Sequence, residues 1–266
     1  MDPRYRLYVA LAGLIPALIA IVIVDRLDAK RPEPAGLRWK VTLFGGLSCL
    51  PAILIELALT GVANARGYPQ LNYPGSAVSA FVIAAMVEEA CKISVVYWLV
   101  WRRPEFDERM DGIVYASRAG LGFAAVENAL YLVTTHNLSD AMQLWILRAV
   151  LAVPGHAMWT GAMGYFAARR RFDRWGPGLL GGFAIAVLGH GIYDYAVFVS
   201  IPLTIEGYEQ WAQLLKAVPP LIIVTFWLMT RRWATTALRL DDADVTRMQA
   251  AAPAHAFPMI PPAPGG

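Results

Sequence analysis

The sequence carries little charge for its length. Only 16% of its 266 residues are charged, whereas 57% are hydrophobic, and its mean hydropathy is +0.46. This composition is too apolar for a soluble domain of this size and is typical of a polytopic membrane protein. The net charge of +3 is not a nucleic-acid signature, because Lys and Arg gather between apolar runs. We therefore expect one all-α membrane helix bundle that lies in the lipid bilayer and has no nucleic-acid partner.

Cysteine is also scarce. Cys49 and Cys91 are the two cysteines, and both fall within apolar runs. A thiol in such a run usually packs as a small hydrophobic side chain, beyond the reach of an oxidase that acts outside the membrane. We therefore expect no disulfide.

Seven apolar stretches are candidates to cross a bilayer as helices. They cover residues 7–24, 41–62, 78–101, 112–134, 142–167, 178–199 and 214–230. The first has no small-residue cleavage site after it, so we interpret it as a retained anchor. We expect residues 1–240 to form one bundle with a motif core at 78–199. Residues 241–266 end in an Ala/Pro-rich segment, and we expect them to be a disordered cytoplasmic tail.

Three ionisable side chains lie in the middle of the third stretch. Each of Glu88, Glu89 and Lys92 would cost about 2.5 kcal/mol or more at the centre of a membrane helix, so they need partners or a function. At helical spacing Lys92 neighbours both carboxylates, and one negative charge is left over.

Polar residues at a similar depth occur in three further stretches. Glu127 is followed by Asn128, and His156 follows a Pro-Gly pair that bends a helix. His190 and Asp194 share a helix face, so the carboxylate can fix the tautomer of the imidazole. One such residue is commonly a hydrogen-bonding contact between helices, but so many at one depth favour a functional site. We expect one water-accessible cavity to contain Glu88, Glu89, Glu127, His156 and His190.

Four other ionisable residues have no clear place in this set. We expect Glu56 and Arg148 to pair with each other or with loops. Arg118 and Asp111 lie near the predicted cytoplasmic end of their helix, where side chains that reach the interface are a sufficient account.

Three motifs on these stretches resemble those of a known family. Glu88-Glu89-Ala90-Cys91-Lys92 matches EExxK, Phe123-Ala124-Ala125-Val126-Glu127 matches FxxxE, and His190-Gly191-Ile192-Tyr193-Asp194 matches HxxxD. In this order the motifs resemble a PrsW-type intramembrane protease, related to the CAAX-prenyl-endopeptidase-like membrane proteins. The prenyl-protein branch has FxxxH where Glu127 stands, so the resemblance is to the PrsW branch.

The resemblance implies a multi-pass hydrolase of the bacterial plasma membrane. Its substrate would be a transmembrane protein, such as an anti-sigma factor, cut in or beside its membrane-spanning helix. The implied catalytic residues are Glu88, Glu89, Glu127, His156 and His190, with supporting roles for Lys92, Phe123, Asn128 and Asp194.

Two modes of water activation are open. Without metal, Glu89 with Glu88 would activate the water, while His190 and His156 stabilise the oxyanion. Alternatively, Zn²⁺ would be held by Glu127, His156 and His190, with Glu89 as general base. The sequence has no HExxH motif, and a lysine lies beside the carboxylates, so we favour the metal-free mode.

Two other classes of function would also place polar residues inside the membrane. A proton- or cation-coupled transporter does so, but no internal inverted repeat is visible. A scaffold or immunity protein would use its polar core only to hold helices together. Incubation of the purified protein with a membrane-spanning peptide separates the three classes, because only a protease cleaves it.

The distribution of Lys and Arg predicts the orientation of the chain. Loops expected inside are rich in these residues, whereas those expected outside contain Arg66 alone. Because cytoplasmic loops carry the excess of positive charge, we predict seven spans, an amino terminus outside and a carboxyl terminus inside. A topology reporter fused near His136 should be external, and one near Arg170 should be cytoplasmic. A cytoplasmic reporter near His136 would contradict the prediction.

Overall fold

The computed structural model describes residues 3–251, and the all-α prediction is confirmed for this part of the chain, which contains no strand. The elements are α1 (Pro3–Leu27), α2 (Ala35–Leu47), α3 (Cys49–Ala65), α4 (Tyr73–Ala77), the π-helical η1 (Val78–Ala85), α5 (Met86–Leu99), α6 (Arg109–Val133), α7 (Leu138–Leu147), the π-helical η2 (Arg148–Ala152), α8 (Val153–Asp173), α9 (Gly178–Phe198), α10 (Ser200–Ile205), α11 (Glu209–Leu215) and α12 (Val218–Ala251).

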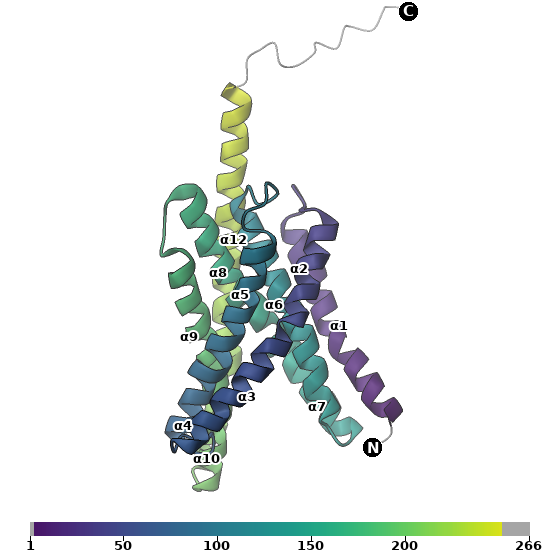
Figure 1. The fold of residues 1–266 in the computed structure, drawn as a ribbon, viewed down its shortest axis with the longest axis vertical. Coiled ribbons are helices and arrows are strands. Elements are labelled where there is room, and N and C mark those ends of the chain that lie inside the picture. Colours follow the sequence, from purple (N-terminus) through teal and green to yellow (C-terminus); the bar gives the residue numbers. More distant parts are fainter. Residues whose placement is uncertain (1–2, 252–266) are drawn as a thin grey trace, which may run out of the picture.

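Helix α6 is the central element of the bundle. It packs against α8 on one side and against α1 and α2 on another, and its side chains are buried without interruption from Arg109 to Ala124. In Figure 1, α12 runs vertically while α1 and α3 are inclined to it, and the view from above shows helices on several sides of α6. The middle of the bundle is therefore lined by α6 and the helices that contact it.

All seven predicted spans are helical in the structure, but they differ in how apolar they are. Four helical stretches, at 3–27, 35–65, 178–205 and 209–251, are long and apolar enough to cross a membrane. Large apolar side chains also cover the outside of the bundle, including Leu54, Trp98 and Leu180. Such a surface suits contact with lipid. The other three predicted spans, at 78–101, 112–134 and 142–167, contain Glu88, Glu89 and Lys92, then Glu127, then Arg148 and His156, and the total of seven remains a prediction.

Local sequence signals explain where several helices begin and end. Asn72 caps α4 by accepting a 2.7 Å hydrogen bond from the Gly75 amide, and Asn137 caps α7 by accepting one of 2.9 Å from the Asp140 amide. Helix α8 ends at Asp173, and the next residue, Arg174, adopts a left-handed conformation with φ of 55°.

The last helix continues past the boundary that the sequence suggested. Helix α12 runs to Ala251, and the Asp241 carboxylate is buried against the start of α6. Its Oδ1 accepts hydrogen bonds from the amide and the guanidinium of Arg109, and its Oδ2 accepts one from the amide of Met110. Asp241 is therefore held by the bundle, and the helix continues with exposed residues from 246 to 251. The rest of the predicted tail, 252–266, lies outside the described residues.

The expectation that Arg118 and Asp111 reach the interface was wrong. Both side chains are fully buried. The Arg118 guanidinium lies 3.3 Å from the Asp25 carboxylate and 4.6 Å from the ring centroid of Trp39. A charge two turns inside α6 thus has its partners in α1 and α2, which fold back over the end of α6.

Two glycines of α6 allow it to contact α8 through backbone. A Cβ on Gly112 would collide with the carbonyl oxygen of Gly164. A Cβ on Gly120 would collide with the carbonyl oxygen of His156 and lie 2.9 Å from Oγ1 of Thr160. Only a residue without a side chain lets two helices approach this closely. Gly120 therefore sets the distance between α6 and the part of α8 that carries His156.

We predict that Gly120→Ala lowers the stability of the purified protein, because α8 must move to admit the methyl group. Overpacking of this kind typically costs about 1–3 kcal/mol. Gly61→Ala is the matched control, since Gly61 lies in α3 and a Cβ there meets no atom within 4 Å. Thermal unfolding in detergent should show a lower midpoint for Gly120→Ala alone, and equal midpoints for the two variants would contradict the prediction.

Candidate active site

Lys92 lies at the centre of a buried polar cluster. Its ammonium group donates to Glu88 Oε2 at 2.8 Å, to Glu89 Oε1 at 2.9 Å and to His156 Nδ1 at 2.8 Å. The helical spacing in α5 supplies the first two contacts, and α8 supplies the third. Lys92 is fully buried, so its three N–H donors are all used inside the protein.

The two adjacent glutamates occupy different environments. Glu89 is fully buried, where Oε1 contacts Lys92 and His190 and Oε2 accepts a 2.8 Å hydrogen bond from Thr160. Glu88 instead lines the cavity described below, and one of its oxygens faces both histidines at 3.8 and 3.9 Å. Of the pair, Glu88 is the carboxylate that can meet a substrate or a water molecule.

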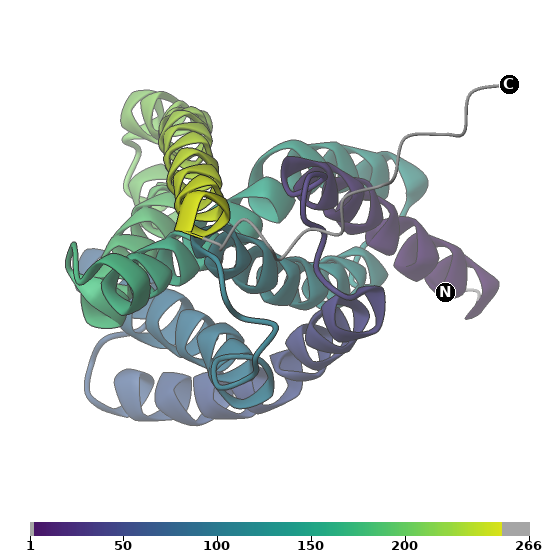
Figure 2. The same ribbon diagram turned by 90° about the horizontal axis from the view of Figure 1, so that it is seen from above.

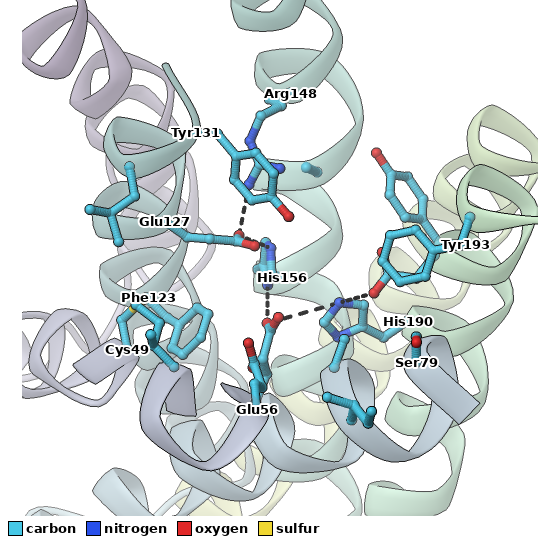
Figure 3. Close-up of a pocket in the computed structure, with 18 of the residues that line it drawn as sticks. Cys49, Glu56, Ser79, Phe123, Glu127, Tyr131, Arg148, His156, His190 and Tyr193 are labelled. Atoms are coloured by element: carbon cyan, nitrogen blue, oxygen red, sulfur yellow. Dashed lines mark hydrogen bonds and ion pairs between the residues drawn. The ribbon is translucent and has the colours of Figure 1, made fainter. Parts of the chain in front are cut away.

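His156 bridges Lys92 and Glu127. An ammonium group can only donate, so Nδ1 of His156 accepts from Lys92 and the ring proton resides on Nε2. Nε2 lies 2.9 Å from Glu127 Oε2 and donates to it (Figure 3). Pro154 precedes this residue and has no amide proton for the helix, and the chain just before α8 is wound as η2. The tautomer of His156 is thus set by Lys92.

Arg148 is a site residue that the sequence reasoning missed, as are Trp159 and Thr160. Its guanidinium donates to Glu127 at 2.7 Å and to Asn128 at 2.7 Å, and Figure 3 shows it on the opposite side of Glu127 from His156. We had expected Arg148 to pair with Glu56 or with a loop, but in the structure it pairs with Glu127 and Asn128 instead. Residues eight apart lie about 80° apart around a regular α-helix, and the wider π turn of η2 reduces this angle. Arg148 therefore projects on nearly the same face as His156.

Asn128 ties this part of the site to the first helix. Its amide nitrogen donates to the carbonyl oxygen of Gly13 at 2.8 Å, while its oxygen accepts from Arg148. Helices α1, α6 and η2 are joined in this way, and the position of Glu127 is fixed by the arginine that Asn128 orients.

His190 is held between carboxylates and an aromatic ring. Its Nδ1 lies 3.1 Å from Glu89 Oε1, and its Nε2 lies 3.3 Å from Asp194 Oδ2. The indole of Trp159 stacks on the imidazole with a centroid distance of 4.4 Å and an angle of 12°. Asp194 therefore contacts His190 on the same face of α9, as the i, i+4 spacing predicted. These contacts and the stacked indole leave the His190 ring little freedom to rotate.

A cavity of about 640 Å³ opens beside this cluster (Figure 3). It is lined by Glu88, Glu127, His156, His190, Asp194 and Arg148 on its polar side. Glu56 of α3 also lines it, together with Tyr131 and Tyr193. Phe123 forms part of the wall, and the Lys92 ammonium lies 4.2 Å from its ring centroid. Both cysteines are free thiols, and Cys49 lines the cavity as an apolar side chain.

The cluster also has the donor types of a metal site. One ligand atom from each of Glu88, His156 and His190 lies within 4.8 Å of the others. Two imidazoles and a carboxylate suit zinc. Glu127 is not in this set, because it lies on the far side of His156. The three residues fit such an ion in type and spacing. However, both ring nitrogens of His156 already have partners, because Nδ1 contacts Lys92 and Nε2 contacts Glu127.

Comparison with known proteins gives a consistent result. Residues 33–229 match the profile described as "PrsW family intramembrane metalloprotease". A "Protease PrsW" of Oceanobacillus iheyensis is 34% identical over 69% of this chain and 80% of its own length. Those of Geobacillus kaustophilus and Clostridioides difficile are 34% and 30% identical over 69% and 80% of this chain, and over 77% and 85% of their own lengths. No solved structure matches the chain.

Proposed function

The chain belongs to the PrsW family of intramembrane proteases, and we propose that its cavity hydrolyses a peptide bond in or beside the membrane-spanning helix of another protein. The observation that carries this proposal is the arrangement of Glu88, His156 and His190 around one cavity inside a lipid-facing bundle. Amide hydrolysis needs a base, an oxyanion donor and an acid for the leaving amine, and these side chains supply all three. Family membership does not favour a coupled transporter.

The shape of the cavity suits a substrate that arrives from the lipid. Its rim includes Leu57 and Leu130, which are 66% and 42% exposed on the apolar outside of the bundle. A membrane-spanning helix can therefore reach the polar side without crossing water. Its backbone carbonyls would be accessible only where the helix is unwound, since helical carbonyls are hydrogen-bonded internally.

We assign the role of general base to Glu88 rather than to Glu89. The Glu88 carboxylate takes a proton from a water molecule as the water oxygen attacks the scissile carbonyl carbon. The oxyanion accepts a hydrogen bond from Nε2–H of His190, which it shares with the Asp194 carboxylate at 3.3 Å, while Glu89 holds Nδ1 of the same ring. Glu88 then gives the proton to the amide nitrogen as the C–N bond breaks. Lys92, Glu127 and Arg148 hold the reacting groups in place.

The metal-dependent route is the second candidate, and the donor set of Glu88, His156 and His190 favours it, as does the description of the matching family. These three residues would hold the ion, and zinc there would supply a Lewis acid and an activated water. We prefer the metal-free route because both ring nitrogens of His156 are held by close polar partners, Lys92 and Glu127, and Lys92 brings a positive charge into the cluster.

We predict that Glu88→Gln abolishes most activity and leaves the fold intact. Loss of a general base typically lowers a rate by about 10²–10⁴-fold. The assay is cleavage of single-span peptides in lipid vesicles, with products identified by mass spectrometry. Glu209→Gln is the matched control, because Glu209 lies on the exposed helix α11 away from the cavity.

Glu89→Gln should also lower the unfolding temperature, since its buried partners lose their acceptor. A folded, inactive Glu89→Gln beside an active Glu88→Gln would reverse the two roles.

We predict that proteolysis survives removal of transition metals. The protein is treated with 1,10-phenanthroline in the presence of Mg²⁺ and Ca²⁺, so that only softer cations are withdrawn. The cleavage rate should stay within about twofold, because Glu88 activates the water directly. Loss of activity that added Zn²⁺ restores would establish the metal-dependent route, with Glu88, His156 and His190 as ligands.

A further inference from the structure

A second group of acidic side chains lies at the opposite end of α6 from Glu127. Asp28 follows α1, Glu33 precedes α2, and Asp111 is in the first turn of α6. One oxygen from each lies within 4.8 Å of the others. The residues are only 2%, 8% and 0% exposed, and none of them lines the active-site cavity. This acidic cluster is therefore separate from the proposed protease site.

The acidic cluster has too few partners for its charge. Neither carboxylate oxygen of Asp28 has a hydrogen-bond partner, and Oδ1 of Asp111 has none either. The other Asp111 oxygen accepts from the amides of Asp107 and Glu108 at 2.8 and 2.7 Å. Glu33 accepts a hydrogen bond from the Tyr115 hydroxyl. Three buried carboxylates thus converge with lone pairs to spare.

No Lys or Arg within residues 3–251 forms an ion pair with any of these three carboxylates. The nearby basic side chains contact other acids: Arg31 pairs with Glu108 and Asp242, and Arg38 and Arg118 pair with Asp25. A buried carboxylate without a counter-charge is costly, so native proteins pair it, protonate it or bind it to a metal.

Charge repulsion and burial act together on Asp28. The Asp28 side chain is buried and lies beside the Glu33 and Asp111 carboxylates, so burial and repulsion both disfavour a bare negative charge there. A bound cation would remove the same repulsion. The spacing is suitable, because Ca²⁺ binds oxygen at 2.3–2.6 Å, so ligands on opposite sides are up to about 5 Å apart.

We propose that Asp28, Glu33 and Asp111 bind one hard divalent cation, Ca²⁺ or Mg²⁺, at the end of the bundle that we predict to be cytoplasmic. A donor set of carboxylate oxygens alone selects hard cations over zinc or copper. The ion joins the α1–α2 connection to the first turn of α6. It therefore stabilises the packing of α1 and α2 on the helix that carries Glu127.

The first test is a cation titration of full-length protein purified in detergent and stripped of metals. Tb³⁺ is the probe, because it replaces Ca²⁺ at oxygen sites and emits light when a nearby aromatic ring is excited. Tyr115, whose hydroxyl donates a hydrogen bond to Glu33, supplies that ring. We expect saturable emission at one equivalent, displacement by Ca²⁺ or Mg²⁺, and an unfolding temperature that rises with the displacing cation. Separate Ca²⁺ and Mg²⁺ arms show which is preferred. Absence of both saturable emission and the temperature shift would overturn the proposal.

The second test locates the binding site. Asp28→Asn should weaken cation binding at least tenfold, and the metal-free variant should remain folded because a buried unpaired charge is removed. Glu33→Gln is the second variant and should give the same loss. Asp242→Asn is the matched control, since the Asp242 side chain is 41% exposed and pairs only with Lys30 and Arg31.

A third variant separates this site from the protease site. Glu88→Gln should retain the emission and the temperature shift, because the cavity is not the binding site. The proposal is overturned if Asp28→Asn and Glu33→Gln bind the cation as tightly as the native chain, or if Glu88→Gln alone loses binding. None of these readouts depends on proteolysis, so the result stands whether or not the proposed function is correct.

Discussion

The buried ammonium of Lys92 is the interaction on which the rest of the site depends. It is the shared counter-charge of two adjacent carboxylates that would otherwise repel each other inside the membrane, and it also fixes the tautomer of His156. Loss of one partner from a buried ion pair commonly costs about 3–5 kcal/mol. Lys92 thus sets the charge state of the cluster, which is why we treat it as a positioning residue although it does not line the cavity.

The backbone brings polar groups together in two ways. The π-helical segments η1 and η2 directly precede the helices that carry Glu88 and His156, and they change the direction in which neighbouring side chains project. Gly120 then lets α6 touch α8 at His156. Departures from regular α-helix and the absence of a side chain are thus concentrated where functional groups must converge.

Both ends of α6 meet carboxylates, but the two groups differ in their counter-charges. Near one end, Glu127 is paired with Arg148 and His156. At the other end, Asp28, Glu33 and Asp111 have no basic partner among the described residues. The first group is internally neutralised and ready to hold a catalytic geometry. The second needs protons or a cation, and this difference is what separates an active-site network from a binding site.

The sequence by itself determined the membrane bundle, the helical stretches and the residues that share a helix face. The contacts of Lys92 with Glu88 and Glu89, and of His190 with Asp194, follow from i, i+3 and i, i+4 spacing. Only the tertiary structure decided that Glu88 rather than Glu89 lines the cavity, that Arg148 pairs with Glu127, and that Asp111 is buried among acids. Spacing fixes neighbours along one helix, whereas contacts between helices depend on crossing, on π-helical winding and on connections that fold back, and these have no local signature in the sequence.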